Sequence, residues 1–405
     1  MRVVGKGYLP ILYTVILSLA FSLASCEPVL EEPPVIETKG KTVVLYMVAN
    51  NNLSGNAQRD LSELKSGYIP EDDNLLVYFH TVTQSPVLLH LYKGEGGQIM
   101  QDTTYRFPNR NSASHQTLTS VLKVAQTLFP ANQYGLILWS HGTGWLPSGY
   151  YSNTGSMNTS ACLYGDYSNY PNDVDPFAHM VKSFGADAGV EMEITDLAKA
   201  LPSKFEFVIF DACLMGGIET FYELKDSVNY VIASPTEILT DGFPYSEISE
   251  HMFSTPVNAK AIASEFYEYY NNMSNLDRSA TIAAVNTSEL NNVAAEAKII
   301  FDKYRNEIQN VDIKNIQRYY RGNKHWFFDL GDFISQLAPT EDDAFKIAMD
   351  KAVIYKAATD KFLDVKIDPL KFSGISTYIP LTPPDNTLNE FYKKFKWNID
   401  SGFIQ

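Results

Sequence analysis

The chain has 405 residues, of which 45% are hydrophobic and 20% are charged, so it is long enough to fold around a large core. Its formal net charge of -15 at pH 7 argues against non-specific binding to nucleic acid, because such binding rewards an excess of Lys and Arg. At about 100–200 residues per domain, this length predicts two units, or one large α/β unit with appendages.

The first 26 residues have the three parts of a secretory signal. Arg2 and Lys6 supply positive charge, and the uncharged apolar stretch 9–24 follows. This stretch is shorter than the roughly 20 residues of a spanning helix. The sequence LASC at 23–26 resembles the bacterial lipoprotein box, which predicts that Cys26 takes a lipid and becomes the mature N-terminus. An ordinary cleaved signal with an incidental cysteine is the alternative. We therefore expect an exported protein, anchored by lipid to a membrane of the bacterial cell envelope.

A tether is expected between this signal and the folded part. Residues 27–41 (EPVLEEPPVIETKGK) are rich in Pro and Glu, a composition that favours an extended, poorly ordered linker. The folded part should begin near Thr42, with an α/β core over 42–245. A mainly helical extension, packed on that core, is expected over 246–405.

Unbroken apolar runs predict buried strands, and spacing of three to four residues predicts helices between them. In chain order, the expected strands cover residues 42–49, 75–82, 87–94, 98–107, 134–141, 205–212, 230–235, 281–285 and 374–380. The expected helices cover residues 115–128, 194–201, 214–224, 246–272, 288–308, 328–337 and 342–359. This alternation predicts an α/β fold with a mostly parallel sheet between helices, which the strand at 374–380 rejoins.

Two of the predicted strands end on reactive side chains. Residues 134–141 end on His141, and residues 205–212 lead directly to Cys213. Because the carboxyl ends of neighbouring parallel strands meet at one sheet edge, these two side chains should lie together. A neighbouring His and a helix N-terminus both favour the thiolate, and Cys213 is expected to have both. The backbone N–H groups of Gly142 and Cys213 are the candidates for an oxyanion hole.

Each residue taken alone has a plainer interpretation. His141 could be an ordinary strand-end histidine, and Cys213 could be a buried apolar side chain. Their pairing at two strand ends favours a Cys-dependent hydrolase. The chain has only three cysteines, too few for a disulfide framework. The remaining one, Cys162, lacks a basic neighbour and a helix start, so it is expected to be a bystander.

Five stretches of the sequence carry a distinctive pattern: LILWSHGTGW (136–145), FVIFDACLMGGIE (207–219), ASPTEILTDGFPY (233–245), FFDLGDF (327–333) and GISTYIP (374–380). Together they resemble the clostripain family of cysteine peptidases, which are relatives of caspases, gingipains and legumains. The resemblance covers roughly residues 42–382. It implies a caspase-like three-layer α/β/α sandwich that hydrolyses peptide bonds in protein or peptide substrates. It also implies that His141 is the catalytic histidine and Cys213 the nucleophile of a dyad, with no third catalytic residue.

The resemblance also implies a basic specificity. Clostripain-like enzymes cleave after Arg or Lys, and acidic residues line their primary pocket. Asp211 falls at the first of these acidic positions and Asp241 at the second, where either could pair with a guanidinium or ammonium group. The alternatives are that Asp211 caps the helix expected near Cys213, and that Asp241 is a turn carboxylate. Tyr46 and residues 50–52, at the end of the first strand, are weaker candidates for substrate contact.

The sequence departs from the family in the loop between the two catalytic residues. Family members often cut themselves after a basic residue there, but residues 143–181 contain no Lys or Arg. The first basic residue after His141 is Lys182. We therefore predict an enzyme that is either active without processing or cleaved near Lys182.

No cofactor is expected to be required. Clostripain itself is calcium-dependent, and the loop residues Asn172, Asp173 and Asp175 could ligate calcium. They lack the Gly and Glu of a twelve-residue calcium loop, so a solvated polar loop is the preferred interpretation. Two other functions stay open: a Cys-dependent amidase or transferase on the same fold, and a surface binding lipoprotein without catalysis.

Overall fold

The structure is a computed structural model that describes residues 38, 40–150, 180–181, 187, 191–321, 325–380 and 384–405. The predicted lipidation site Cys26, most of the tether, Cys162, residues 172–175 and Lys182 lie outside the described residues. Thr38–Gln405 form one compact unit. Within the described ranges, no helix is both long and apolar enough to cross a bilayer.

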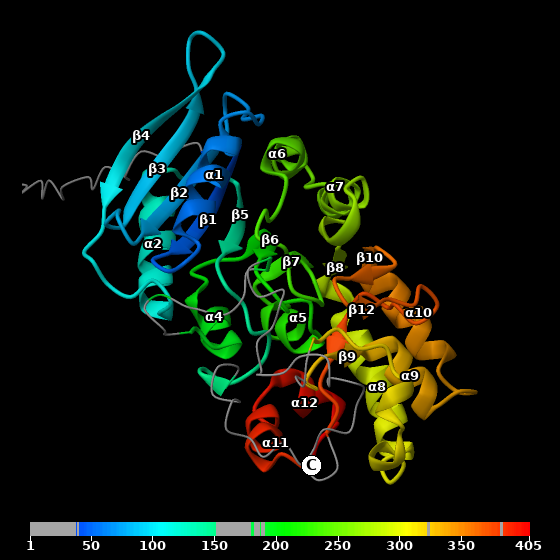
Figure 1. Ribbon diagram of the computed structural model, residues 1–405. Coiled ribbons are helices and arrows are strands. Elements are labelled where there is room, and N and C mark those ends of the chain that lie inside the picture. Colours follow the sequence, from blue (N-terminus) through cyan, green and yellow to red (C-terminus); the bar gives the residue numbers. More distant parts are fainter. Residues whose placement is uncertain are drawn as a thin grey trace, which may run out of the picture. The chain divides into compact units, whose positions relative to one another are not determined.

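A nine-stranded sheet lies at the centre of this unit, in the order β10-β8-β7-β6-β5-β1-β2-β3-β4 (Figure 1). The parallel strands are β1 (Lys41–Ala49), β2 (Asn74–Thr81), β5 (Gln133–Trp139), β6 (Phe205–Asp211) and β7 (Val228–Ala233). Antiparallel strands extend both edges: β3 (Val87–Lys93) and β4 (Ile99–Arg106) beyond β2, and β8 (Thr281–Asn286) and β10 (Val353–Ala358) beyond β7. The mostly parallel α/β sheet predicted from the sequence is therefore confirmed.

Helices cover both faces of the sheet. The α1 face carries α1 (Ser54–Leu64), α6 (Tyr245–Phe253) and α7 (Ala259–Asn271). The α2 face carries α2 (His115–Leu128), α4 (Ile194–Ala200), α5 (Ile218–Leu224), α8 (Leu290–Lys303), α9 (Leu330–Leu337), α10 (Asp343–Ala352), α11 (Asn386–Tyr392) and α12 (Lys396–Ser401). Successive residues of β1 alternate between the two cores: Leu45 and Met47 pack on the α1 face, and Val44 and Tyr46 on the α2 face. This period of two explains why the strand is an unbroken apolar run.

The helix predicted over residues 214–224 is wrong at its start. Leu214 has a positive φ of 63°, and α5 begins only at Ile218. Two glycines disfavour helix in between. Gly216 also passes so close to the next loop that a Cβ there would lie 2.4 Å from the nitrogen of Pro235. Cys213 therefore does not lie at a helix N-terminus, and the dipole support expected for its thiolate is absent.

Two predictions in the C-terminal part are also wrong. The helix expected over 342–359 ends at Ala352, and the chain continues as β10 because the sequence VIYKAA suits the open edge of β8. Residues 374–380 do not rejoin the central sheet: only Ser376–Thr377 form a strand, which pairs with β9 (Phe328–Asp329) in a separate ladder. The domain boundary expected at residue 245 stays a prediction, although β8 and β10 beyond it belong to the central sheet.

Candidate active site

The pairing of β5 with β6 brings the two predicted catalytic residues to one edge of the sheet. The strands run parallel, with Trp139 directly opposite Asp211. The Ser140 N–H donates to the carbonyl of Asp211 at 3.4 Å, so the two chains stay aligned beyond the last pair. His141 and Cys213 each follow their aligned strand end by two residues. The register of the two strands therefore places His141 opposite Cys213 at the carboxyl edge of the sheet.

Gly142 lies in direct contact with the backbone of Cys213. A Cβ at position 142 would lie 2.3 Å from the carbonyl oxygen of Cys213 and 3.1 Å from its nitrogen. Any larger residue would push the two strand ends apart. The Leu214 N–H donates to the carbonyl of Thr236 at 2.9 Å, so it is already engaged. Position 142 therefore tolerates only glycine, and the assignment of the Gly142 and Cys213 N–H groups to an oxyanion hole stays a prediction.

The ring of His141 has a partner that the sequence did not suggest. Its Nε2 lies 2.9 Å from Oδ1 of Asn52, which follows β1, the neighbour of β5 in the sheet. An amide oxygen there accepts a hydrogen bond from the Nε2–H group and fixes the plane of the ring. Asn52 belongs to the group considered above for substrate contact, and the structure places it against the histidine.

The thiol of Cys213 is enclosed in this structure. Its side chain is 1% exposed, and Sγ lies 3.2 Å from the nitrogen of Ile238 and 3.7 Å from its oxygen. The loop that supplies Ile238 is held by a buried ion pair between Glu237 and Arg321, with Nη2 at 3.0 Å from Oε1. In this structure Sγ is therefore closed off from solvent, in contact with the loop that carries Ile238.

The segment between His141 and Cys213, called the linker from here on, pairs with the same loop over a short stretch. Val181 forms an antiparallel bridge with Leu239, and the Thr240 N–H donates to the carbonyl of Met180 at 2.9 Å. These residues immediately precede Lys182 in the sequence. Met180 and Val181 therefore lie beside the loop that carries Ile238.

Asp211 is buried on the α1 face of the sheet, not at a helix cap. Its Oδ2 accepts from the hydroxyl of Tyr245 at 2.8 Å and from the N–H of Phe243 at 3.4 Å. A second buried carboxylate, Asp60 on α1, accepts from Nε1 of Trp139 at 2.7 Å. Burial, followed by the charges of Asp211 and Asp60, raises the pKa of Tyr245 well above its usual value. Two acidic side chains thus lie beside the end of β5 on one face of the sheet.

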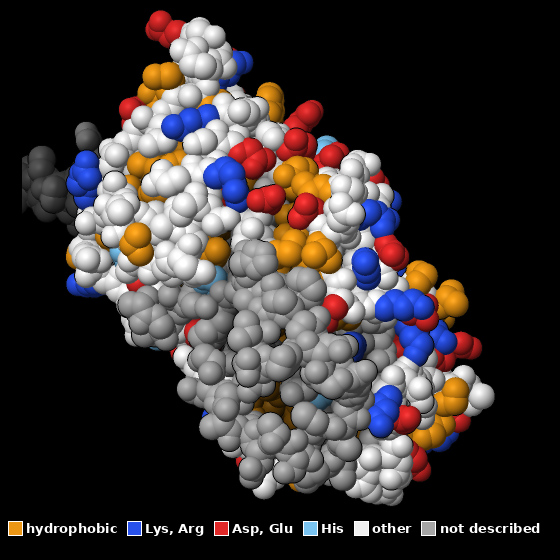
Figure 2. All heavy atoms as spheres, in the orientation of Figure 1, with side chains coloured by type: hydrophobic (Ala, Val, Ile, Leu, Met, Phe, Trp, Pro, Cys, Tyr) orange, Lys and Arg blue, Asp and Glu red, His pale blue; other side chains and the backbone are white. Residues whose placement is uncertain are grey.

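Asp241 lies at the surface of the same face. It belongs to a turn closed by the Gly242 N–H on the carbonyl of Leu239 at 3.0 Å, and Gly242 has a φ of 69°. Its Oδ1 is 2.9 Å from Nη2 of Arg59 on α1, and both side chains are about half exposed. Figure 2 shows several acidic side chains gathered over α1, α6 and α7 with a basic side chain beside them. The structure therefore brings the two predicted acids to one face, but only Asp211 is buried.

The comparisons with known proteins decide the family. The model of the clostripain family matches residues 45–160 and 165–404. The chain belongs to the clostripain family of cysteine peptidases. Clostripain of Hathewaya histolytica is 27% identical over 238 residues, which cover 52% of this chain and 42% of that protein. The match thus spans less than half the length of that curated relative.

Solved structures of the family share the fold. An inactive zymogen of a C11 protease from Parabacteroides distasonis has a TM-score of 0.74 and 34% identity, covering 90% of this chain and 98% of that chain. A secreted C11 cysteine protease from Bacteroides thetaiotaomicron, in complex with an irreversible peptide inhibitor, has a TM-score of 0.71 and 26% identity, covering 90% and 99%. The caspase-like α/β sandwich expected from the resemblance is confirmed.

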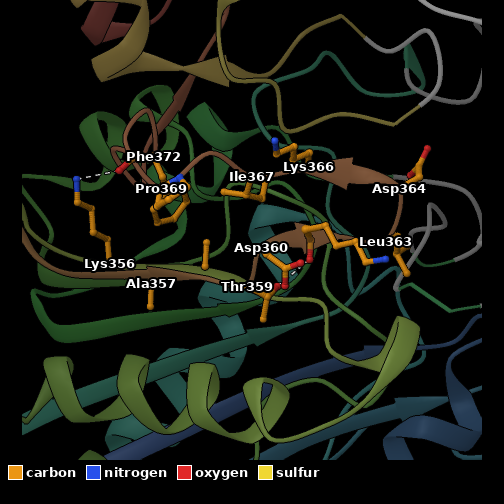
Figure 3. A pocket seen from close by; sticks show the side chains of 12 residues that line it. Lys356, Ala357, Thr359, Asp360, Leu363, Asp364, Lys366, Ile367, Pro369 and Phe372 are labelled. Carbon is orange, nitrogen blue, oxygen red and sulfur yellow. Dashed lines mark hydrogen bonds between the residues drawn. The ribbon is translucent and has the colours of Figure 1, made fainter.

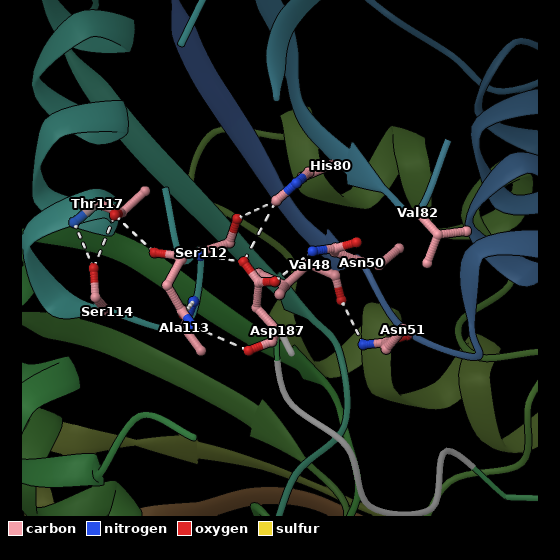
Figure 4. A network of polar contacts seen from close by, with 12 residues as sticks. Val48, Asn50, Asn51, His80, Val82, Ser112, Ala113, Ser114, Thr117 and Asp187 are labelled. Atoms are coloured by element: carbon pink, nitrogen blue, oxygen red, sulfur yellow. Dashed lines mark hydrogen bonds and ion pairs between the residues drawn. The ribbon is translucent and has the colours of Figure 1, made fainter. Parts of the chain in front are cut away.

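A buried polar network anchors another linker residue of this clostripain-family chain (Figure 4). Asp187 is 2% exposed and accepts from Nδ2 of Asn50 at 2.7 Å and from the N–H of Ser112 at 2.5 Å. Nδ1 of His80 lies 3.5 Å from Asp187 and 2.6 Å from Oγ of Ser112. The hydroxyl of Tyr46, which was a weaker candidate for substrate contact, donates to the carbonyl of Ser112 at 2.8 Å and so belongs to this network. Nothing in the sequence signalled Asp187 or His80, because neither lies in a recognisable motif.

A wide hollow of about 870 Å³ lies away from the catalytic residues of this family member (Figure 3). It lies between the end of β10 and the hairpin of β11 (Lys361–Phe362) and β12 (Val365–Lys366), and Nζ of Lys356 donates to the carbonyl of Phe372 at 2.9 Å. Neither His141 nor Cys213 lines it.

Within the described residues, no group of His, Cys, Asp and Glu side chains is arranged to hold a metal ion.

Proposed function

We propose that the protein is a cysteine endopeptidase in which Cys213 is the nucleophile and His141 the general base and acid. The observation that carries this proposal is the strand register, which sets both residues two positions beyond paired strand ends. The fold and family of the relatives agree with it.

The chemistry follows from these positions. His141 takes the proton of the thiol, and the sulfur of Cys213 attacks the scissile carbonyl carbon. The N–H groups of Gly142 and Cys213 stabilise the negative charge that develops on the carbonyl oxygen. His141 then gives its proton to the leaving amine, and water hydrolyses the acyl-enzyme. The contact with Asn52 would hold the ring in place during both proton transfers.

We propose that the enzyme cleaves after Arg or Lys. Two buried carboxylates, Asp211 and Asp60, lie on the α1 face next to the end of β5, and Asp241 lies at the surface of that face. A carboxylate in a buried site attracts a guanidinium or ammonium group strongly, and a guanidinium can bind it through two parallel hydrogen bonds. Asp211 is the residue expected to contact that group.

The enclosed thiol supports a further part of the proposal, that this form is a precursor. Cys213 is covered by the loop that carries Ile238, and the linker residue Val181 pairs with Leu239 beside it. Cleavage near Lys182 would release Val181 and the residues before it from the covalent connection to the rest of the linker, so their pairing with the loop could open. A solved relative of the same fold is described as an inactive zymogen.

We propose export through the signal and lipid anchoring at Cys26, which a relative described as secreted supports only as far as export. We also propose that no metal is required, so activity should persist in a chelator. The absence of a metal requirement is checked by measuring turnover with and without excess EDTA.

The decisive experiment compares wild type, Cys213→Ala and Asp211→Asn on fluorogenic peptides with Arg, Lys, Asp or Asn before the reporter group. Wild type should hydrolyse the Arg and Lys substrates, and Cys213→Ala should hydrolyse none. Asp211→Asn should lose about 10²-fold or more in kcat/KM on the Arg substrate, because a charged hydrogen-bonded pair is worth about 3 kcal/mol or more. Equal rates for Asp211→Asn and wild type would remove Asp211 from the pocket. No turnover, with no labelling of Cys213 by a basic acyloxymethyl ketone, would favour a binding protein.

A further inference from the structure

A small pocket opens beside His141 on the α2 face of the sheet. Its volume is about 120 Å³. Strand residues of that face form apolar walls, including Tyr46, Leu138 and Phe210, and Leu197 of α4 adds to them. His141 and the loop that follows it line the same pocket. The pocket therefore borders the proposed general base.

This pocket and the acidic residues lie on opposite faces of the sheet. Phe210 belongs to the core of the α2 face, whereas the next residue, Asp211, points into the α1 face with Tyr245. In an extended peptide, successive side chains also point to opposite sides. A substrate whose Arg or Lys side chain enters the α1 face therefore directs the neighbouring side chain toward the α2 face.

The position of the histidine decides which neighbour that is. The leaving amine must receive its proton from His141, so the residue after the scissile bond has to lie on the histidine side of the site. We infer that the pocket binds the side chain of this residue and selects an apolar side chain of medium size. The inference rests on the proposed peptidase function and extends it to a second specificity site.

The dimensions and the polar rim of the pocket set the preference. A cavity of about 150 Å³ holds benzene, so 120 Å³ suits Val, Leu or Met and excludes Trp. Glu191 also lines the pocket: its Oε2 accepts from Oγ1 of Thr143 and from the N–H of Gly149, both at 3.3 Å. Its Oε1 is buried and has no hydrogen-bond partner in the described part of the chain. A carboxyl group there disfavours an acidic side chain in the substrate.

The test uses internally quenched peptides with Arg before the scissile bond and Leu, Met, Gly, Asp or Trp after it. Wild type should show a kcat/KM for Leu and Met that is about 10-fold or more above Gly, the usual discrimination of an apolar pocket. Ala113→Leu, at another residue that lines the pocket, should bring the Leu-to-Gly ratio close to one. Ala295→Leu, at an exposed position on α8, is the matched control and should keep the wild-type ratio. Glu191→Gln should raise the rate for Asp relative to Leu.

An Arg coumarin amide has no residue after the scissile bond, so it tests the peptidase activity without the pocket. Turnover of this amide together with a flat profile in wild type would mean that the pocket is unused or is filled by another part of the chain, and would overturn the assignment. No turnover of the amide or of any peptide would overturn the peptidase proposal and the pocket assignment with it.

Discussion

At the scale of single residues, the α1 face combines acids that differ in exposure. Asp211 and Asp60 are buried and hydrogen-bonded to aromatic side chains, whereas Asp241 is half exposed and paired with Arg59. Arg59 therefore holds a guanidinium group where the guanidinium of a substrate is proposed to approach. The sequence could not show this, because no helix was predicted over α1.

This contact leads to a prediction for Arg59→Gln. Removing the guanidinium leaves Asp241 free to attract a basic substrate, so KM for Arg and Lys substrates should fall while kcat stays the same. Exposed ion pairs are worth about 0.2–1 kcal/mol, so the fall should be about 1.5- to 5-fold. Steady-state kinetics at low and high salt check this, since the difference should shrink as salt screens the charges. An unchanged KM at low salt would show that Asp241 is a turn carboxylate only.

His80 offers a prediction about pH. Burial lowers the pKa of His80 below its usual value, although the charge of Asp187 opposes this. The unfolded chain binds a proton at His80 near pH 6.5, and the folded protein takes it up only at lower pH. Stability is thus fully present above pH 6.5 and is lost as the pH falls toward the lowered pKa. The free energy of unfolding, from urea titrations at pH 7.5 and 5.5, should fall more in wild type than in His80→Asn. Equal falls in both proteins would assign the acid sensitivity to other groups.

At the scale of elements, the sequence predicted the central strands better than the segments around them. The buried strands β1, β5 and β6 are long apolar runs and could be predicted, whereas their order along the sheet comes from the structure alone. The two catalytic candidates lie at strand ends, where such a pattern is most informative.

The errors have a common physical origin. Cys213 is followed by a turn because two glycines and a close backbone contact outweigh the helical spacing of the apolar residues. Residues 353–358 form a strand because they meet the open edge of β8, and this partner is distant in sequence. Both outcomes depend on tertiary contacts, which local periodicity does not contain. The contact between His141 and Asn52 could not be predicted for the same reason.

The linker gives a prediction at this scale. Met180 and Val181 pair with the loop that encloses Cys213, and the next residue in the sequence, Lys182, is the first basic residue after His141, so self-cleavage is expected there. N-terminal sequencing of the processed wild type should give a fragment that begins at Ser183. Lys182→Ala and Cys213→Ala should both stay intact. Lys199→Ala is the matched control and should be processed normally, because Lys199 lies within α4 and a helix resists proteolysis unless it unfolds locally. A cut at another position, present in wild type and absent from Cys213→Ala, would contradict the assignment of Lys182.

At the scale of the whole molecule, a buried ion pair links the beginning of the sheet to the helices of the α1 face. Nζ of Lys41, at the start of β1, lies 2.7 Å from Oε2 of Glu206 on β6, and both side chains are nearly inaccessible. Lys41 also donates to the carbonyls of Met252 and Ser254 at 3.1 and 2.6 Å, and Glu206 accepts from the N–H of Val257 at 2.9 Å. The pair thus holds the end of α6 against the amino-terminal ends of two parallel strands, at the sheet edge opposite the catalytic residues.

Glu206→Gln should therefore lower stability without altering the site directly. It leaves the ammonium group of Lys41 buried without a counter-charge, which costs about 3–5 kcal/mol. Equilibrium unfolding by urea measures the loss, and active-site titration of the folded fraction at low temperature should show normal reactivity of Cys213. Glu341→Gln removes the carboxylate of the exposed pair with Lys303 and should change the free energy of unfolding far less. A small loss in Glu206→Gln would mean that Lys41 keeps enough backbone acceptors to remain charged and buried without its partner. The junction would then depend on those hydrogen bonds more than on the ion pair.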